Sequence, residues 1–224
     1  MRFLDLGSVS PEYSVCADHA LFTSHRNGSE DILMVYTRDR PAISLGRFRS
    51  VGDVNDKNIS IVRRISGGGS IYSDPGQMTY SVIFKKERVP GSREESFRII
   101  CACLVRAFGL LGIEASHKPV NDILVNGKKI SGSAQYRCRG SVIQHGSIIL
   151  RIDRDDVRRY LISAKGPDWI TSAEDVLGYV PERTEVIKAL KIGFRDIFGG
   201  MTDDALTDNE NEMIRGLMEK EAWK

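Results

Sequence analysis

The sequence predicts an α+β fold in one main domain. Segments typical of strands and helices are interspersed along the chain without the regular strand–helix–strand rhythm of a parallel α/β protein. The 224 residues are enough for one well-buried core, or at most for two modest domains. Because no repeat, low-complexity stretch or obvious linker divides the chain, we expect one domain over residues 1–224.

The first predicted elements are a helix and a series of strands. Ser10 and Pro11 suit the N-cap and the first position of a helix that continues through the segment EYSVCADHALF. Runs of β-branched and other apolar residues then predict strands. These lie at 32–38 and 42–47, in a run that ends at Arg64, and at 79–86.

The clearest helix is predicted over residues 92–112. Ser92 and Glu95 have the spacing of a capping box, and Gly112 lies where a C-terminal glycine cap belongs. Between them, apolar residues recur at the spacing of one helix face. This stripe comprises Phe97, Ile100, Leu104, Val105, Phe108 and Leu111.

A hairpin and further helices complete the prediction. The Asn-Gly pair at 126–127, between two strand-like runs within 122–137, is the strongest short hairpin signal in the chain. An Arg-Gly turn at 139–140 leads into another strand at 141–152. Helices are expected at 154–164, 182–198 and 207–220.

Composition and the N-terminus exclude several classes of protein. The net charge is only +2, so no nucleic-acid partner is expected. The chain has no long apolar run, so no membrane association is expected either. The first residues, MRFLDLGSVSPEYS, lack the basic start and long apolar middle of a signal peptide, and we therefore expect a cytoplasmic protein.

The four cysteines are not spaced for metal or dithiol chemistry. Cys16, Cys101, Cys103 and Cys138 include no C-x-x-C pair, which argues against a zinc ribbon or a thioredoxin motif. We expect Cys101, Cys103 and Cys16 to be small apolar core residues. We assign no catalytic role to Cys138.

Three consecutive glycines follow two arginines in the segment RRISGGGSIYSDPG, residues 63–76. Such a run lets a ligand approach the backbone and can present successive N–H groups to an anion, while guanidinium suits carboxylate or phosphate. The alternative is a flexible surface turn with two solvated arginines. Neither a Walker A lysine nor the helix of a dinucleotide fingerprint follows, so this segment alone predicts only an anion site.

Two lysines lie at the base of the predicted hairpin turn. Strand alternation points Lys128 and Lys129 to opposite sides, so one can enter a site while the other is solvated. The alternative, that both are exposed turn lysines, is weakened by the small polar residues at 131–133 and by Asn121-Asp122 on the partner strand. A lysine beside a carboxylate and an anion site suits adenylation, because fixed positive charge offsets the repulsion between a carboxylate and the α-phosphate of ATP.

Three ordered segments resemble the lipoate–protein ligase A family. Residues 63–74, RRISGGGSIYSD, resemble its lipoate-binding loop, R-R-x-S/T-G-G-G-A-V-x-H-D. The Asn-Asp-Ile at 121–123 followed by GKKISGSA at 127–134 resembles N-D-I … G-K-K-I-x-G-x-A, and QHGSIIL at 144–150 resembles the family's H-G-T/S-L-L strand. Weaker similarity covers 40–47, 170–175 and 193–194, so the resemblance spans most of the chain.

The resemblance implies the biotin/lipoate ligase fold, a mixed β-sheet flanked by helices and related to class II synthetase domains. It implies a two-step reaction in which lipoate and Mg²⁺–ATP give lipoyl-AMP, which then acylates a lysine of an apo lipoyl domain. The acceptor would belong to a 2-oxoacid dehydrogenase complex or be the glycine-cleavage carrier protein. Lipoate and octanoate are not separated, since both fit a slender apolar tunnel.

The resemblance also assigns roles to residues. Lys129 matches the family's catalytic lysine, whose role would be electrostatic. Asp122 would position Mg–ATP or the incoming lysine, and it is the one candidate Mg²⁺ ligand. His145 is expected either at the pocket edge or as a satisfied strand histidine. The residues expected to bind lipoate or lipoyl-AMP are Arg64, Ser66, Gly67, Gly68, Gly69, Ser70, Tyr72, Asp74, Asn121, Ser131, Gly132, Ser133, Ala134, His145 and Gly146.

The sequence departs from the family pattern in two respects. Ser73 stands where many ligases carry histidine, and Gln77 and Thr79 stand where they carry asparagines. Many of these ligases also have an accessory C-terminal domain, which we do not expect here. The tail before Lys224 resembles the end of the catalytic domain in archaeal relatives, where the accessory domain is a separate polypeptide. We therefore expect a partner subunit for the adenylation step.

Other functions within and outside this superfamily are weighed against the ligase. Octanoyltransferases and lipoyl amidotransferases share similarity at 79–83 and 132–148, but they use a cysteine nucleophile at places that hold Lys118-Pro119-Val120 and Val142 here. Their glycine loop tends to contain G-G-R, so the ligase is favoured. A biotin ligase would carry G-R-G-R-x-G, which is absent. A non-catalytic paralogue that binds lipoyl domains is a further alternative, disfavoured because Lys129 is retained.

Overall fold

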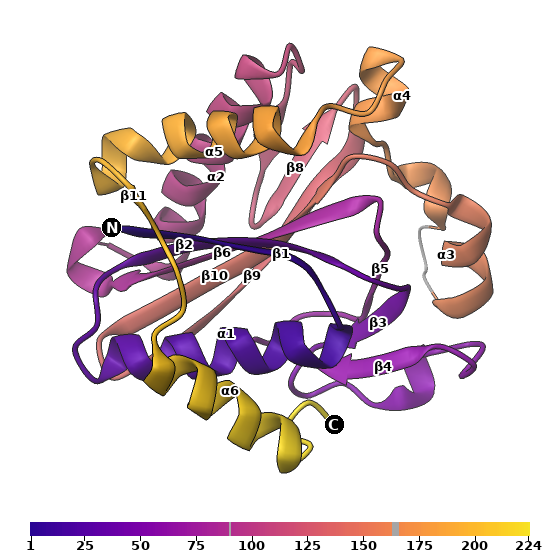
Figure 1. Ribbon diagram of the computed structural model, residues 1–224. Coiled ribbons are helices and arrows are strands. Elements are labelled where there is room, and N and C mark those ends of the chain that lie inside the picture. The colour runs from indigo at the N-terminus through magenta and orange to yellow at the C-terminus, as the bar shows by residue number, and fades with distance from the viewer. Residues whose placement is uncertain (90, 163–165) are drawn as a thin grey trace.

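A mixed eight-stranded β-sheet forms the centre of the protein in the computed structural model (Figure 1), which describes residues 1–89, 91–162 and 166–224. The strand order is β11-β1-β2-β6-β10-β9-β8-β7. The pairs β11–β1 and β1–β2 are parallel, and the remaining pairs are antiparallel. The strands are β1 (Arg2–Val9), β2 (Ile32–Arg38), β6 (Gln77–Lys85), β7 (Ser116–Lys118), β8 (Asp122–Val125), β9 (Lys128–Cys138), β10 (Ser141–Ile149) and β11 (Thr202–Asp204).

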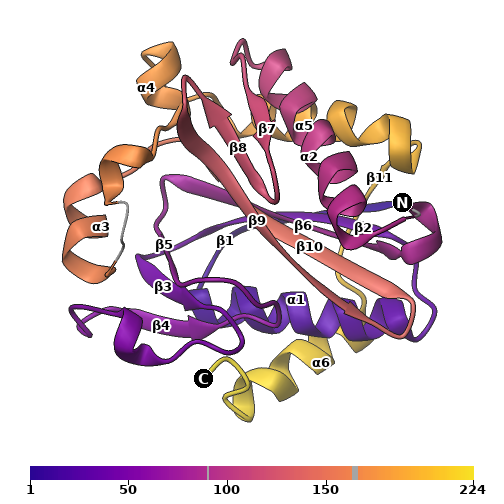
Figure 2. The same cartoon turned by 180° about the vertical axis from the view of Figure 1, so that it is seen from behind.

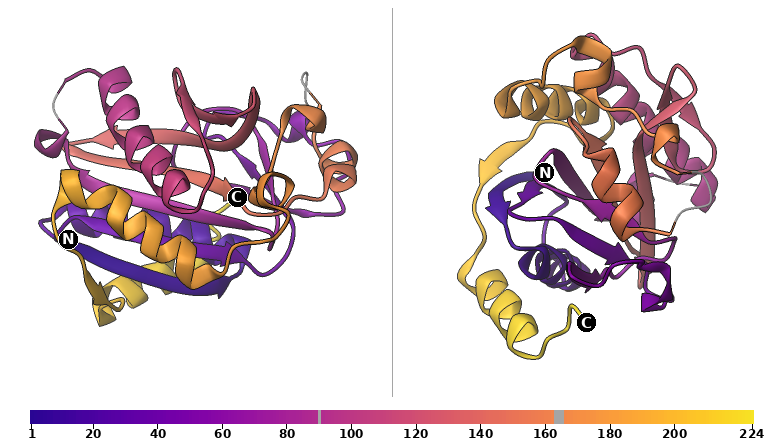
Figure 3. Two further views of the ribbon diagram at one scale, coloured as in Figure 1. Left: turned by 90° about the horizontal axis from the view of Figure 1, so that it is seen from above. Right: turned by 90° about the vertical axis from the view of Figure 1, so that its right-hand side faces the viewer.

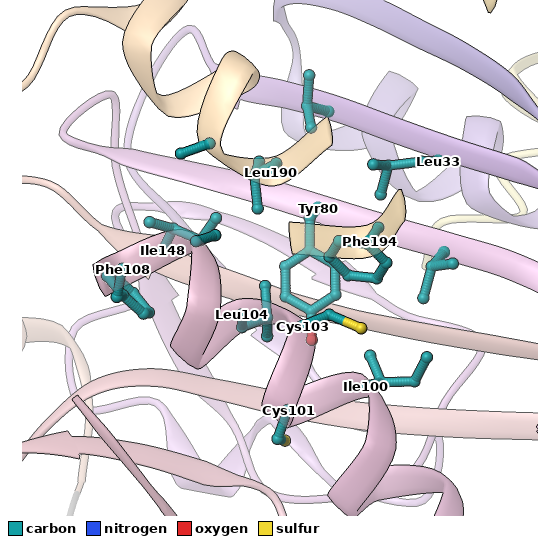
Figure 4. Close-up of a cluster of buried hydrophobic side chains, with 14 of the residues drawn as sticks. Leu33, Tyr80, Ile100, Cys101, Cys103, Leu104, Phe108, Ile148, Leu190 and Phe194 are labelled. Carbon is teal, nitrogen blue, oxygen red and sulfur yellow. The ribbon is translucent and has the colours of Figure 1, made fainter. Parts of the chain in front are cut away.

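Two pairs of helices cover the two faces of this sheet (Figures 2 and 3). Helices α2 (Arg93–Leu110) and α5 (Arg183–Phe198) pack on one face, and α1 (Pro11–Arg26) and α6 (Asp208–Glu219) pack on the other. Side chains of β2 alternate between the two cores: Leu33 belongs to the first and Met34 to the second. Figure 4 shows the core under α2 and α5, where Tyr80 and Phe194 meet.

A small second sheet lies beside α1 and carries the glycine loop. It has the strand order β4-β3-β5, with β3 (Ala42–Leu45), β4 (Ser60–Arg63) and β5 (Ile71–Ser73). The loop between β4 and β5 contains the three glycines. Two short helices, α3 (Arg154–Tyr160) and α4 (Ala173–Leu177), follow β10. None of the helices in the described ranges is long and apolar enough to cross a membrane.

The predicted fold class and both predicted turns are confirmed. The sheet is mixed and flanked by helices. Asn126 and Gly127 have φ values of 49° and 77°, and Arg139 and Gly140 have φ values of 49° and 80°. Positive φ at both central residues is the conformation of a two-residue hairpin turn that matches the twist of its strands.

The predicted places of the cysteines in the core are also confirmed. Cys16, Cys101 and Cys103 are at most 4% exposed. The two cysteines of α2 both belong to the core between α2, α5 and the sheet. Cys138 is half-buried near the end of β9.

Several elements were not predicted or were predicted with different limits. The sequence analysis missed β1, β5, β7, β11 and α4, because these are short, polar or, in β1, interrupted by Gly7. The capping box of α2 forms only in part: Ser92 accepts from the Glu95 amide, whereas the Glu95 carboxylate pairs with Arg98. The helix predicted at 154–164 ends at Tyr160, and its last expected residues, 163 and 164, lie outside the described residues.

Candidate active site

A pocket of about 530 Å³ opens on the α1 side of the large sheet. Its floor follows one row of paired residues across four strands: Tyr36 of β2, Thr79 of β6, Ser147 of β10 and Gly132 of β9. Residues of α1, β5, the N-terminus of α2 and the glycine loop complete the wall. The row crosses four neighbouring strands that are roughly 4.8 Å apart.

Most of the residues expected to bind substrate line this one pocket. They come from the glycine loop, from the segment before β8, and from β9 and β10. They are Arg64, Gly67, Gly68, Gly69, Ser70, Asn121, Lys129, Gly132, Ser133, Ala134, His145 and Gly146.

Five expected residues do not line the pocket. Tyr72 and Asp74 point elsewhere: the Tyr72 hydroxyl donates to Asp156, and Asp74 accepts from the Gly76 amide at the following turn. Ser131 lies on the opposite side of β9 from Gly132, because side chains alternate along a strand. Ser66 and Asp122 stand behind the wall, where each contacts residues that do line it.

Arg64 holds the glycine loop in place, a role that the sequence analysis did not predict. Its Nη2 donates to the carbonyls of Gly67 and Gly69 at 2.8 and 2.6 Å, and its Nη1 donates to the Ser44 carbonyl at 2.8 Å. Burial lowers the pKa of Arg64 to about 10, and the charge of Arg38 acts in the same direction, but the guanidinium stays cationic at neutral pH. Most of its N–H groups are therefore occupied by protein rather than free for a ligand.

The loop that Arg64 holds leaves its amides available. Within the described residues, the N–H groups of Gly67, Gly68 and Gly69 donate no hydrogen bond to protein. Gly68 has φ of 97°, a conformation that glycine adopts without strain. A β-carbon at Gly67 or Gly69 would meet no protein atom within 4 Å, so it would project into open space. Successive free amides of this kind can bind an anion.

Positive charge dominates the pocket. Among the described residues, its wall contains four cationic side chains, of Arg38, Arg64, Arg93 and Lys129, and one carboxylate, of Asp18. Arg38 is only 5% exposed, and burial lowers its pKa. Its Nη1 donates to Ser73 at 2.6 Å, while its Nε has no partner in the described structure. This balance of charge favours anionic ligands.

A β-bulge aims Lys129 into the pocket. The pairing of β8 with β9 shifts between Ile123 and Leu124, which leaves Ile130 as an extra residue on β9. Ile130 packs in the core under α2, whereas Lys129 and Gly132 both line the pocket. Without this extra residue, the odd spacing between Lys129 and Gly132 would place them on opposite faces.

The ammonium group of Lys129 is fixed by two contacts. Its Nζ lies 2.6 Å from Asp122 Oδ1 and 5.5 Å from the centre of the Trp169 ring. The Lys129 carbonyl accepts from the Thr171 amide at 2.9 Å, which ties β9 to the segment before α4. Lys128 is exposed, as strand alternation predicted. The structure thus presents one lysine of the pair to the pocket.

Both expectations for His145 are met. It is 6% exposed on β10 and lines the pocket. Its Nδ1 bonds to Asp18 at 2.7 Å and its Nε2 bonds to Ser66 at 2.5 Å, so neither ring nitrogen is free. The sequence analysis missed Asp18, whose only signal was a carboxylate on the apolar side of a predicted helix.

A model of the lipoyl protein ligase A/B catalytic domain matches residues 10–195. The chain belongs to this lipoyl protein ligase A/B family. The match begins at the N-cap of α1 and reaches α5, so it includes every segment of the pocket wall described above.

Relatives within the family carry two different names. The octanoyltransferase LipM of Kyrpidia tusciae is 29% identical over 98% of this chain and 95% of its own length. The octanoyltransferase LipM of Staphylococcus epidermidis is 31% identical over 99% of this chain and 97% of its own length. The lipoate-protein ligase LplJ of Bacillus subtilis is 30% identical over 66% of this chain and 46% of its own length.

Solved structures confirm the fold of this lipoyl protein ligase A/B family member. A lipoate-protein ligase A bound with ATP superposes with a TM-score of 0.89 at 24% identity, covering 100% of this chain and 96% of that one. The bi-partite lipoate protein ligase of Thermoplasma acidophilum superposes with a TM-score of 0.86 at 23% identity, covering 98% of this chain and 92% of that one. A biotin protein ligase from Aquifex aeolicus superposes with a TM-score of 0.52 at 12% identity, covering 98% of this chain and 75% of that one. This likeness is expected for a biotin/lipoate ligase fold.

The cysteines of this family member are not placed for nucleophilic catalysis. No cysteine lines the pocket in the part of the chain that the structure describes. Burial raises the pKa of the Cys101 thiol to about 11 and that of the Cys103 thiol to about 12, so both are protonated at neutral pH. Burial likewise raises the pKa of Cys16 to about 11.

Among the described residues, no group of three or more histidine, cysteine or acidic side chains is placed to hold a metal ion. Asp122, the expected Mg²⁺ ligand, already bonds Lys129 through one oxygen. Mg²⁺ bound to nucleotide phosphates commonly needs only one or two protein carboxylates. The donor set therefore fits only a Mg²⁺ that is also held by the phosphates of a bound nucleotide.

Proposed function

We propose that this chain is a lipoate–protein ligase that forms lipoyl-AMP from lipoate and ATP and transfers the lipoyl group to a lysine of a lipoyl domain. The observation that carries the proposal is the position of Lys129, which the β8–β9 bulge turns into a positively charged pocket opposite a loop of free amides. Adenylation needs fixed positive charge and donors for two anions, and this pocket provides both.

In the first step a lipoate carboxylate oxygen attacks the α-phosphorus of ATP, and the bond to pyrophosphate breaks. The Lys129 ammonium faces the pocket and offsets the repulsion between the two anions, so its contribution is electrostatic. The free amides of residues 67–69 bind the negatively charged oxygens of the acyl phosphate. The second oxygen of Asp122 would hold a Mg²⁺ carried by the nucleotide phosphates, which would supply positive charge against the leaving pyrophosphate.

In the second step the acceptor lysine amine attacks the acyl carbon and AMP leaves. The nucleophile must be neutral, so the acceptor ammonium first gives its proton to bulk water. Asp122 is the carboxylate closest to Lys129 and can orient the incoming amine. Asn121 shapes this part of the wall, because its side-chain amide donates to the Ser133 carbonyl and its own carbonyl accepts from the Ser133 amide.

Octanoyl transfer is the second candidate function. The names of the LipM relatives, which cover nearly the whole chain, favour it. A thiol-dependent transferase holds its acyl group on a cysteine and needs no ATP. The described pocket wall contains Lys129 and no cysteine, which favours the ligase. A catalytically silent protein that binds lipoyl domains is disfavoured by the same arrangement of Lys129 and Asp122.

Two partners are part of the proposal. The acceptor is an apo lipoyl domain of a 2-oxoacid dehydrogenase complex or the glycine-cleavage carrier protein. A separate accessory subunit is required for adenylation, in keeping with the bi-partite architecture of the Thermoplasma acidophilum ligase. We regard residues 1–224 as the catalytic domain of that pair.

The test is an intact-mass assay of acceptor acylation. The chain is incubated with an apo lipoyl domain and lipoate plus Mg–ATP, with lipoyl-adenylate alone, or with an octanoyl carrier protein alone. We expect lipoyl-adenylate alone to give a lipoyl mass shift of the acceptor. Lipoate should give the same shift only when both ATP and the accessory subunit are present. Octanoyl transfer from the carrier without ATP would replace the ligase with the transferase. No acylation in any tube, with the accessory subunit supplied, would contradict both.

A further inference from the structure

A chain of hydrogen bonds between buried side chains connects α1 with the glycine loop. Asp18 Oδ2 lies 2.7 Å from His145 Nδ1, His145 Nε2 lies 2.5 Å from Ser66 Oγ, and Arg64 Nε donates to Ser66 Oγ at 3.2 Å. The exposed fractions of Asp18, His145, Ser66 and Arg64 are 2%, 6%, 0% and 7%. The Asp18–His145 and His145–Ser66 contacts join distant parts of the sequence, so the tertiary fold creates this chain.

When His145 is neutral, the hydrogen bonds between Asp18, His145, Ser66 and Arg64 can form in only one donor–acceptor direction. A carboxylate only accepts hydrogen bonds, so Nδ1 of His145 must carry the proton and donate to Asp18. In the neutral ring, Nε2 is then an acceptor. The Ser66 hydroxyl then donates to Nε2, and its oxygen accepts from Arg64, which only donates. The other oxygen of Asp18 accepts from the Ser81 hydroxyl at 2.5 Å. Each buried group in the chain thereby has a partner.

The last member of the chain controls the backbone of the anion site. Arg64 Nη2 holds the carbonyls of Gly67 and Gly69. A peptide unit is planar and trans, so fixing the Gly67 carbonyl also fixes the Gly68 N–H, which points the opposite way. That N–H is one of the free amides of the pocket. The orientation of Arg64 therefore determines where a free amide of the loop points.

We propose that Asp18 is a positioning residue for the anion site, acting through His145, Ser66 and Arg64 on the glycine loop. Asp18 fixes the tautomer and ring orientation of His145, His145 fixes the Ser66 hydroxyl, and Ser66 fixes the guanidinium plane of Arg64. The loop conformation is then set in the free protein, before any ligand binds. Only the identity of the ligand in the proposal rests on the proposed ligase function.

The first experiment needs no ligand. In ¹H–¹⁵N spectra of the free protein, we expect Ser66→Ala and Asp18→Ala to shift the amide signals of Gly67, Gly68 and Gly69. Ser81→Ala is the matched control: it also deletes a buried hydroxyl bonded to Asp18, but on the side away from the loop. Glycine signals that move equally in Ser81→Ala, or that stay unchanged in Ser66→Ala, would overturn the proposal.

The second experiment measures binding of synthetic lipoyl-adenylate by calorimetry. Ser66 is suited to this test because it does not line the pocket. We expect Ser66→Ala to weaken binding about tenfold, the effect of one lost buried hydrogen bond, and Ser81→Ala to change it less than about twofold. The melting temperatures of these two variants should fall by similar amounts, which separates loop positioning from general destabilisation.

A double-mutant cycle decides whether the residues act as one chain. If Asp18 acts through Ser66, the variant with both Asp18→Ala and Ser66→Ala should bind lipoyl-adenylate no more weakly than the weaker single variant. Additive losses would contradict the relay and leave Asp18 as an independent pocket residue. If the unmodified protein fails to bind lipoyl-adenylate, the proposed function is wrong, and the glycine spectra alone decide the positioning role.

Discussion

Lys129 Nζ lies 2.6 Å from Asp122 Oδ1, on neighbouring strands whose pairing is shifted by a bulge at Ile130. The absence of a side chain at Gly132 makes this contact possible. A β-carbon there would overlap Cε and Nζ of Lys129 and approach Asp122 Oδ1 to 3.2 Å. Lys129, its carboxylate partner and a glycine thus form one unit, which permits direct tests.

Replacing Lys129 should abolish adenylation without unfolding the protein. With the accessory subunit supplied, we expect Lys129→Ala to reduce lipoate-dependent pyrophosphate exchange by about 10²–10³-fold, because removing one fixed electrostatic group from an active site has effects of this size. Lys128→Ala is the matched control, since Lys128 is exposed on the other side of the same strand. Equal losses in the two variants would argue against a specific role for Lys129.

A side chain on the glycine loop should block the ligand and spare the fold. Gly68 is one of the residues expected to bind lipoate, but its φ of 97° and the 2.9 Å approach of a β-carbon to Arg64 mean that a substitution there would also strain the loop. Gly69→Val is a cleaner test, because its side chain enters open space. We expect calorimetric affinity for lipoate to fall at least about tenfold, with an unchanged melting temperature.

Gly200→Val is the control for this substitution. Gly200 is also exposed and lies outside helices and strands, and a β-carbon there meets no atom within 4 Å. It does not line the pocket. Both variants should therefore melt alike, and only Gly69→Val should lose lipoate binding. Retained binding in Gly69→Val would mean that lipoate does not lie against the loop.

The cysteines should be dispensable for acyl transfer. Cys138 is half-buried near the end of β9, where Arg26 approaches its sulfur at 3.8 Å, and it does not line the pocket. We expect Cys138→Ser to retain acyl transfer from lipoyl-adenylate within about twofold, measured by intact mass. Cys101→Ser should also stay active, because burial keeps that thiol protonated. Loss of transfer in either variant, with Lys129→Ala still active, would favour a thiol mechanism.

The stability of the fold should depend on pH through Arg2 and Glu210, which form two hydrogen bonds of 2.6 and 2.9 Å. Burial raises the pKa of Glu210, but the hydrogen bonds from Arg2 and Thr207 and the charge of Arg2 together outweigh it, and the net pKa is lowered. A lowered folded-state pKa means that the stabilisation is fully present above the unfolded value of about 4.3 and is lost as the pH falls through the folded value.

Removing the Glu210 charge tests this directly. We expect Glu210→Gln to lower the free energy of unfolding by about 2 kcal/mol at pH 7, because Arg2 then loses its charged hydrogen bonds to Glu210 and keeps only Asp204 as a counter-charge. The difference from the unmodified protein should shrink as the pH drops below about 4. Urea titrations at several pH values measure it, with exposed Glu212→Gln as the control. A difference that is independent of pH would show that the charge of Glu210 does not contribute.

The sequence by itself determined the elements whose signals are local. The apolar run of β2, the apolar stripe of α2 and the Asn-Gly hairpin turn are short-range patterns, and all three match the structure. The ordered glycine, lysine and histidine segments were enough to identify the family and most of the pocket wall. These features depend on residues within one turn or one hairpin of each other.

Only the tertiary structure decided the geometry of the site. The bulge that aims Lys129 arises from the register between two strands, and no residue signals it alone. Arg64 was expected to bind the ligand, yet the fold brings backbone carbonyls around its guanidinium and makes it a support for the loop. Asp18 reaches His145 across 127 positions of sequence. Contacts of this kind depend on how helices and strands pack, which local patterns do not encode.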